Sequence, residues 1–273
     1  MGFIKKVIKK GFNTIGYELL NQSMYKKYEK ERFALKDSIE RLLFLISHTD
    51  TSKDKAEVFS FFNFAADKIL KSKAQLFQDL FVLYHFKNKE NGFFIEFGAT
   101  DGVTLSNTYL LEKEYRWNGI LAEPGKVWKN RLKENRNCCI DNRCVWSTSG
   151  QILVFNETNI AELSTINHFS DSDFLTDQRR NSKTYEVETL TLNDLLELYN
   201  APAIIDYLSI DTEGSEYEIL KGFDFSKYQI EIITVEHNYT PMREEIYALL
   251  TKNGYQRVFE SISLFDDWYR KVH

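Results

Sequence analysis

Residues 93–102 read FFIEFGATDG, and this short run decides the fold that the sequence predicts. Apolar and aromatic residues of high β propensity surround an acid, Glu96, and lead into a turn with glycines at positions 98 and 102. A buried parallel strand ends in this way when a ligand lies over its carboxyl end, because glycine lets the backbone come close and adopt a positive φ. We therefore expect a strand and a tight turn that form part of a nucleoside site.

A second apolar run at 118–122 precedes another acid, Glu123, at a distance from Glu96 that suits one βαβ unit. An acid at the tip of the second strand can accept two hydrogen bonds from a ribose diol. We interpret Glu96 and Glu123 as the acids of one nucleoside half-site. The alternative is a strand, turn and helix that bind no ligand.

Charge indicates which nucleoside fits this turn. A dinucleotide-binding turn reads Gly-x-Gly-x-x-Gly and holds a pyrophosphate at a helix N-terminus. Here one glycine of that pattern is missing, and Glu96 and Asp101 bring negative charge to the same place. Carboxylates repel a pyrophosphate and attract an ammonium or a sulfonium. The turn therefore favours S-adenosylmethionine, which carries both cations.

Several ordered motifs resemble those of the FkbM-type methyltransferases. They lie at residues 95–108, 110–113, 119–124, 210–223 and 234–239, so that the resemblance covers about residues 72–260. It implies an α/β, Rossmann-like class I methyltransferase fold with a mostly parallel seven-stranded sheet and helices on both faces. It also implies S-adenosylmethionine as cofactor and methyl transfer to a sugar hydroxyl of a glycan or natural product.

The cofactor site that we expect combines the glycine turn, the two acids and a loop beside the adenine. Its residues are Glu96, Gly98, Ala99, Thr100, Asp101, Gly102, Ser106, Asn107, Glu123, Pro124, Arg143 and Asp211. An amphipathic helix is expected over 72–83. The resemblance adds Gln78 and Asp79 of this helix at the methionyl end, where helix surface residues are the alternative.

The chemistry is expected at the next two strands, 204–210 and 231–235. Their carboxyl ends face the same crevice in a doubly wound sheet, so that Asp211 and the run 236–238 should converge near the transferable methyl. In one mechanism, Asp211, Glu236 and His237 bind Mg²⁺ or another divalent ion, which lowers the pKa of the acceptor hydroxyl. In the other, His237 removes the hydroxyl proton as a general base.

Residues beyond these strand ends are expected to contact the acceptor. The candidate substrate-binding residues are Glu213, Asn238, Tyr239 and Arg243. The polar segment 156–184 lacks clear periodicity, and it is either an acceptor-binding lid or a surface excursion. Residues 254–259 and 261–265 read as a closing pair of strands.

Two parts are expected along the chain: a helical extension at 1–70 and the methyltransferase domain at 71–273. Lysines flank an apolar face within residues 1–15, which is either an interfacial helix on an anionic membrane or a helix packed on the body of the protein. A heptad-like seam at 18–47 either forms a homodimer or packs against a helix at 53–71.

Composition narrows the possible partners. A formal net charge of −5 argues against general binding of nucleic acid. The three cysteines lack a CxxC pair, which favours a reducing compartment, and we expect a cytoplasmic enzyme. The interfacial alternative for residues 1–15 would place it at the inner face of the membrane. Two rival functions stay open: a nucleotide-dependent oxidoreductase or glycosyltransferase, and a non-catalytic glycan-binding protein.

Overall fold

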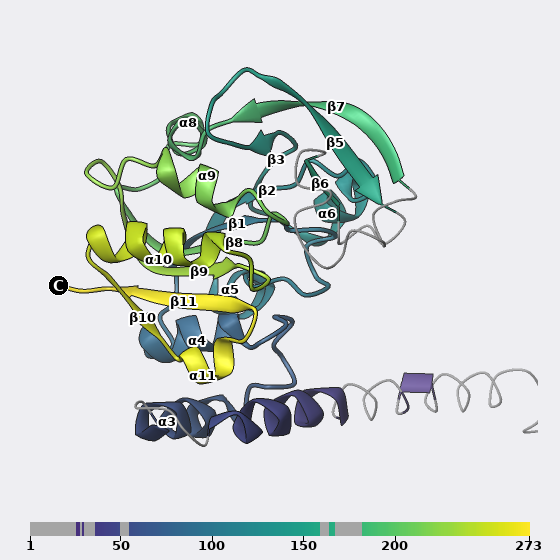
Figure 1. The fold of residues 1–273 in the computed structure, drawn as a ribbon. Helices are drawn as coiled ribbons and strands as arrows, with labels where there is room; N and C mark the ends of the chain where they lie inside the picture. The colour runs from purple at the N-terminus through teal and green to yellow at the C-terminus, as the bar shows by residue number, and fades with distance from the viewer. Residues whose placement is uncertain (1–25, 28, 30–35, 50–54, 159–163, 167–181) are drawn as a thin grey trace, which may run out of the picture. The chain divides into compact units, whose positions relative to one another are not determined.

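The computed structural model describes the chain except for residues 1–25, 28, 30–35, 50–54, 159–163 and 167–181 (Figure 1). Contacts divide the chain into two units, Met1–Ser47 and His48–His273. Residues 36–46 of the first unit are helical. The expected interfacial helix at 1–15 and half of the heptad-like seam lie outside the described residues, so the membrane contact and the homodimer stay predictions. Within the described ranges, no helix combines the length and apolar character needed to cross a membrane.

The second unit contains a seven-stranded sheet with the order β10-β11-β9-β8-β1-β2-β3. Only β11 runs against the other strands, because it is antiparallel to both β9 and β10. The mostly parallel sheet that the sequence predicted is therefore confirmed. The strands are β1 (Phe93–Phe97), β2 (Asn118–Ala122), β3 (Cys139–Asp141), β8 (Ile204–Ile210), β9 (Gln229–Glu236), β10 (Tyr255–Val258) and β11 (Asp266–Lys271).

Helices cover both faces of this sheet, and successive residues of β11 show how. Trp268 stacks on Phe81 of α4 at a ring distance of 4.8 Å, whereas Tyr269 belongs to the core beneath α8, α9 and α10. Neighbouring residues of a strand point to opposite faces, so α4 and the other three helices cover different faces. The helices of this unit are α3 (Lys55–Ala65), α4 (Gln78–His85), α5 (Tyr109–Tyr115), α6 (Lys129–Asn135), α8 (Leu192–Leu198), α9 (Glu216–Lys221), α10 (Met242–Lys252) and α11 (Glu260–Ser263).

An aromatic cluster joins α3 to the sheet. Phe61 of α3 lies 5.6 Å from Phe259 and 6.2 Å from Trp268, measured between ring centroids. The sequence led us to expect that the N-terminal extension ends at residue 70. In the structure, the contacts between residues divide the chain between Ser47 and His48. The difference arises because the aromatic face of α3 packs against residues from the far end of the chain, which periodicity does not reveal.

A smaller four-stranded sheet, with the order β4-β7-β5-β6, is inserted between β3 and β8. Its strands are β4 (Cys144–Val145), β5 (Ile152–Thr158), β6 (Thr165–Ile166) and β7 (Ser182–Leu190). The expectation of an irregular segment at 156–184 is wrong at both ends, because Asn156 pairs with Thr184 and with Thr165. The rest of that segment lies outside the described residues, and its role as a lid stays a prediction.

Two local predictions are wrong, and both fail at a residue with positive φ. A helix expected over 72–83 begins only at Gln78, because Phe77 has φ 66°. Residues 261–265 were expected to form a strand. They instead contain the end of α11, bracketed by Phe259 at φ 56° and Leu264 at φ 54°. The true closing strand, β11, comes directly afterwards.

Candidate functional site

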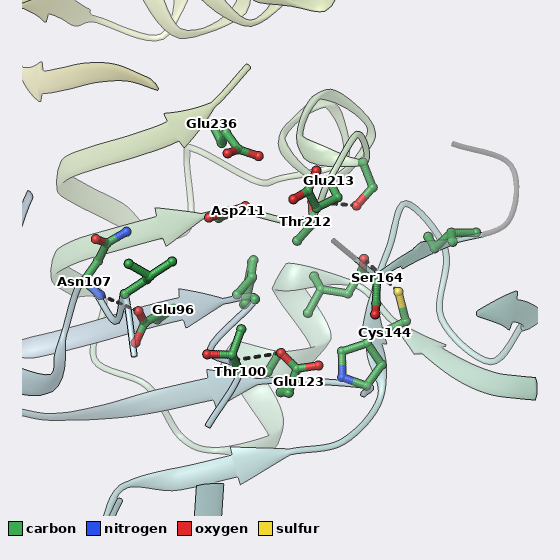
Figure 2. A pocket seen from close by; sticks show the side chains of 18 of the residues that line it. Glu96, Thr100, Asn107, Glu123, Cys144, Ser164, Asp211, Thr212, Glu213 and Glu236 are labelled. Atoms are coloured by element: carbon green, nitrogen blue, oxygen red, sulfur yellow. Dashed lines mark hydrogen bonds between the residues drawn. The ribbon is translucent and has the colours of Figure 1, made fainter. Parts of the chain in front are cut away.

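A cavity of about 330 Å³ opens where β1, β2, β8 and β9 end (Figure 2). The sequence-predicted residues in its wall are Glu96, Gly98, Thr100, Asn107, Glu123, Pro124, Asp211, Glu213, Glu236 and Asn238. The other predicted residues do not line it: Ala99, Asp101, Gly102, Ser106, Arg143, His237, Tyr239 and Arg243. The carboxyl ends of neighbouring strands therefore do converge, but not every residue beside them faces the cavity.

Glu96 is buried at the end of β1, and its carboxylate organises the loop that follows the glycine turn. It accepts hydrogen bonds from the backbone N–H of Asn107 at 2.6 Å and from the hydroxyls of Ser106 at 3.0 Å and Thr108 at 2.5 Å. The fully buried guanidinium of Arg136 lies 3.5 Å away and balances the charge. Glu96 thereby holds Asn107 in the cavity wall.

The side-chain oxygen of Asn107 is available to accept a hydrogen bond from a ligand. Its amide nitrogen donates to Ser209 Oγ at 2.9 Å, whereas its Oδ1 is buried without a hydrogen-bond partner among the described residues. A buried acceptor in this state is costly unless a ligand satisfies it. An ammonium group is a suitable donor for such an oxygen.

The turn after β1 is packed tightly against the end of β8. Gly98 has φ 76°, and a Cβ there would run into the carbonyl oxygen of Asp211. Asp101 does not face the cavity, because its carboxylate accepts the backbone N–H groups of Val103 at 2.9 Å and Thr104 at 2.7 Å. Asp101 therefore shapes the turn.

Glu123, at the end of β2, uses both carboxylate oxygens on the backbone. Oε2 accepts the N–H of Thr100 at 2.9 Å, and Oε1 accepts that of Gly125 at 2.7 Å. Burial raises the pKa of Glu123 to about 7 despite these two hydrogen bonds. An oxygen with a second lone pair free can still accept a hydroxyl donor, so the position suits a ribose diol.

Three acids face Glu123 across the cavity: Asp211, Glu213 and Glu236 (Figure 2). One carboxylate oxygen from each lies within 4.8 Å of the others. Burial raises the pKa of Asp211 to about 6. Burial and then the charge of Asp211 raise the pKa of Glu236 well above its usual range. Two adjacent buried carboxylates do not both ionise readily, so Glu236 holds a proton when Asp211 is charged.

His237 lies outside the cavity wall and is only 4% exposed. Its Nδ1 accepts the backbone N–H of Tyr239 at 3.0 Å, and its Nε2 lies 3.6 Å from Asp267 Oδ1. Burial lowers its pKa to about 4, so the ring is neutral near pH 7. Arg243 is committed to the same Asp267, through contacts of 3.0 and 2.7 Å. The third member of the cluster with Asp211 and Glu236 is therefore Glu213, and not His237 as expected from the sequence.

One end of the cavity, where the adenine was expected, is apolar. Arg143 was expected there, but it pairs with Asp141 at 2.6 Å and lines a separate cavity of about 280 Å³. The wall instead takes side chains from β4, β5 and β6 of the small sheet. Cys144 belongs to the loop that was expected beside the adenine, whereas sequence reasoning did not find Val145, Phe155 and Ile166.

The segment before α4 also differs from expectation. Gln78 donates to Asp266 Oδ2 at 2.6 Å, and Asp79 accepts from the Ser72 hydroxyl at 2.6 Å, so both are buried structural residues. Gln75, three residues earlier, lines the cavity in their place. The remaining wall residues that the sequence did not single out are Phe97, Thr104, Leu105, Ala122, Ser164, Thr212, Ser215 and Phe265.

Strand order and site together define a class I, Rossmann-like methyltransferase fold, with a ligand site where the strands end. The family model described as Methyltransferase FkbM domain matches residues 96–257. The chain therefore belongs to the FkbM methyltransferase family. Family membership makes it a methyltransferase that uses S-adenosylmethionine.

Similarity to solved structures is weak. Precorrin-6y C5,15-methyltransferase from Geobacter metallireducens GS-15 is 11% identical with a TM-score of 0.36, over 66% of this chain and 70% of that one. Ribosomal protein L11 methylase from Lactobacillus delbrueckii subsp. bulgaricus is 9% identical with a TM-score of 0.36, over 72% and 77% of the two chains. These TM-scores support no argument about activity. No curated protein matches this chain at a significant level.

The cavity fits S-adenosylmethionine in the chemistry of its wall. Glu123 suits the ribose, and the apolar group of Cys144, Val145 and Phe155 suits the adenine. Asn107 Oδ1 has no donor in the part of the chain that the structure describes, and it suits the ammonium. The acids beside it favour a cationic sulfur over a phosphate.

Proposed function

We propose that this protein transfers a methyl group from S-adenosylmethionine to a hydroxyl oxygen of a saccharide. The observation that carries the proposal is the carboxyl pair of Asp211 and Glu236 in the wall opposite Glu123. An alcohol is a poor nucleophile, and a base beside it makes attack on a methyl group feasible. S-adenosylmethionine, when bound, supplies a methyl group activated by a positively charged sulfur.

Asp211 is the base in this proposal. With a pKa of about 6 it is ionised near pH 7 and can accept the hydroxyl proton. Glu236 keeps its own proton, which it shares with Asp211, and Asn238 donates to Glu236 Oε2 at 2.9 Å. His237 is unsuited to the role, because its Nδ1 is occupied by a backbone N–H and it does not face the cavity.

The wall supplies many groups that can bind an acceptor rich in hydroxyls. Polar side chains near the acids include Gln75, Thr104, Ser164, Thr212 and Asn238. Such a set can donate to and accept from several hydroxyls at once. Together with the family resemblance, this supports a saccharide acceptor. We expect the reaction to occur in the cytoplasm, where the three free cysteines stay reduced.

A second mechanism for the same reaction rests on the three acids. Asp211, Glu213 and Glu236 bring hard oxygen ligands within 4.8 Å of one another, as Mg²⁺ or another divalent ion requires. Bound there, such an ion would lower the pKa of the acceptor hydroxyl.

Calorimetry and methyl uptake test the proposal together. We expect S-adenosylmethionine and S-adenosylhomocysteine to bind, whereas NAD and UDP-sugars bind far more weakly. Incubation with oligosaccharides and sugar nucleotides should then add 14 mass units per methyl group, at a hydroxyl, by mass spectrometry. Equal binding of NAD would overturn the cofactor assignment, and methylation confined to non-saccharide acceptors would overturn the acceptor class.

A further inference from the structure

Two consecutive residues at the end of β9 adopt left-handed backbone conformations. Asn238 has φ 44° and Tyr239 has φ 57°, and neither is a glycine. Such conformations cost free energy in residues with a Cβ, and they persist where the surroundings impose them. The two residues follow Glu236, whose carboxyl group belongs to the acid cluster. The site therefore includes a strained turn at positions 238–239.

Hydrogen bonds from four backbone N–H groups impose this turn. The N–H groups of His237 and Asn238 both donate to the carbonyl oxygen of Phe265, at 2.9 and 3.2 Å. The N–H of Thr240 donates to the carbonyl oxygen of His237 at 2.8 Å. The N–H of Tyr239 has a side-chain acceptor instead, His237 Nδ1, at 3.0 Å. The imidazole thus completes the turn.

His237 is itself held in one orientation. Because Nδ1 accepts a hydrogen bond, the proton of the neutral ring is on Nε2, which faces Asp267 Oδ1 at 3.6 Å. Asp267 is fixed in turn by Arg243 at 2.7 Å and by Arg257 at 3.2 Å. The His237 ring also meets the Tyr239 ring edge to face, with centroids 5.4 Å apart and planes at 77°. Both the backbone and the ring of Tyr239 therefore depend on His237.

The result is an aromatic ring presented to solvent beside the cavity. Tyr239 is 64% exposed, although its neighbour Asn238 lines the cavity wall. A large exposed aromatic side chain that is held by strain, in a turn next to an acid cluster, has the form of a contact for a ligand.

We propose that Tyr239 is a platform for one face of the acceptor's sugar ring, and that His237 is the positioning residue that holds the platform. This inference rests on the proposed saccharide acceptor and deepens it. A pyranose ring has an apolar face of C–H groups and a polar edge of hydroxyls. The tyrosine ring matches the apolar face, while Asn238 and the acids beside it match the hydroxyl edge.

Binding experiments test the platform without requiring turnover. The probes are methyl α-D-mannopyranoside, methyl α-D-glucopyranoside and methyl α-L-rhamnopyranoside, added to the full chain in the presence of S-adenosylhomocysteine. Saturation-transfer NMR titrations give the Kd of each glycoside, and calorimetry gives the Kd of S-adenosylhomocysteine. We expect Tyr239→Ala to weaken glycoside binding at least tenfold and Tyr239→Phe to change it less than twofold. The Kd of S-adenosylhomocysteine should stay within twofold in both. Leu198→Ala, at a side chain of similar exposure outside the wall, is the matched control.

Variants of His237 test the positioning role. His237→Ala removes the acceptor for the Tyr239 N–H and should weaken glycoside binding about as much as Tyr239→Ala. His237→Asn places an amide oxygen near the position of Nδ1 and should restore most of the affinity. The double variant His237→Ala/Tyr239→Ala should bind no more weakly than Tyr239→Ala alone, because His237 acts through Tyr239. If His237→Ala does not fold, the asparagine variant and the two Tyr239 variants still decide the result.

The outcomes separate this inference from the proposed function. Absence of glycoside binding by the wild type, or equal binding by Tyr239→Ala, overturns the platform. Equal losses in Tyr239→Phe and Tyr239→Ala overturn it as well, because the hydroxyl and not the ring face would then carry the contact. A glycoside that binds through Tyr239 but receives no methyl group overturns the proposed function and leaves the platform standing.

Discussion

The carbonyl oxygen of Asp211 occupies the place where a Cβ on Gly98 would have to lie. The turn after β1 is thereby pressed against the end of β8, and the half of the cavity proposed for the cofactor is joined to the half proposed for the reaction. A side chain at position 98 would both strain the backbone, which has φ 76°, and push the two halves apart.

Gly98→Ala should therefore lower both stability and cofactor affinity. Gly150→Ala is a matched control, because Gly150 also has φ 76° but a Cβ there meets nothing within 4 Å. The control should cost about 1 kcal/mol of unfolding free energy, and Gly98→Ala at least about 2 kcal/mol more. Denaturant unfolding and S-adenosylhomocysteine calorimetry measure both effects. Equal losses in the two variants would show that the approach to Asp211 is not tight.

Glu123→Ala should weaken S-adenosylhomocysteine binding by about 1–3 kcal/mol, through the loss of charge-assisted hydrogen bonds to the ribose. The variant also removes the acceptor of the Thr100 and Gly125 N–H groups, so its melting temperature needs to be measured in parallel. An analogue that lacks the ribose hydroxyls separates the two effects. It should bind the wild type and the variant with similar affinity. Unchanged affinity for S-adenosylhomocysteine itself would place the ribose elsewhere.

The raised pKa of Glu123 predicts a pH dependence of stability. Its pKa goes from an ordinary 4.5 to about 7 on folding, so between these values the folded chain binds the extra proton. Stability therefore falls as the pH rises from 4.5 to 7, by at most about 3 kcal/mol from this group, and is level above. Glu123→Gln should remove that part of the slope and leave the rest. Urea unfolding of both proteins between pH 5 and 8 gives the comparison, and parallel slopes would contradict the assignment.

Asp211→Asn should lower kcat by about 10²–10⁴-fold, because an amide cannot accept the hydroxyl proton. The wild-type rate should fall as the pH drops through about 6, since protonated Asp211 no longer serves as a base. Initial rates between pH 5 and 8.5, with a saccharide acceptor identified by mass spectrometry, test both statements. Arg143→Gln, at a residue outside this cavity wall, should keep the wild-type profile.

Metal removal distinguishes the two ways of activating the hydroxyl. Full activity after EDTA treatment and gel filtration is expected if Asp211 acts alone as the base. Loss of activity that Mg²⁺ or Mn²⁺ restores would instead assign the three acids as ligands. In that case Glu213→Gln should raise the metal concentration needed for half-maximal activity, and this dependence is measured by titration of the ion.

The strands of the site were predictable because they carry near-continuous apolar runs. β1, β8 and β9 are buried on both faces, and such strands read as apolar throughout. Glu123 follows β2 and Asp211 follows β8, and both are close enough to the strand ends for their place in the crevice to follow from topology alone.

The expected and the observed cavity walls differ because the sequence does not show which way a side chain points or which distant residues it contacts. His237 comes directly after Glu236, and neighbouring extended residues point to opposite sides, so only one of the two faces the cavity. Arg243 does not line the cavity because it donates a hydrogen bond to Asp267 of β11, a residue that is near it only in the folded chain. Phe155 and Ile166 come from a second sheet whose pairing no local pattern revealed.

The small sheet enters the chain between β3 and β8, whereas the register of β1 against β8 is fixed by the large sheet. Substitutions in β5 or β6 would therefore reshape the apolar side of the cavity, which contains Phe155 and Ile166, and would leave the spacing between Glu123 and Asp211 unchanged. Evolution can in this way adjust the fit of the adenine end without moving the carboxyl groups proposed for the reaction.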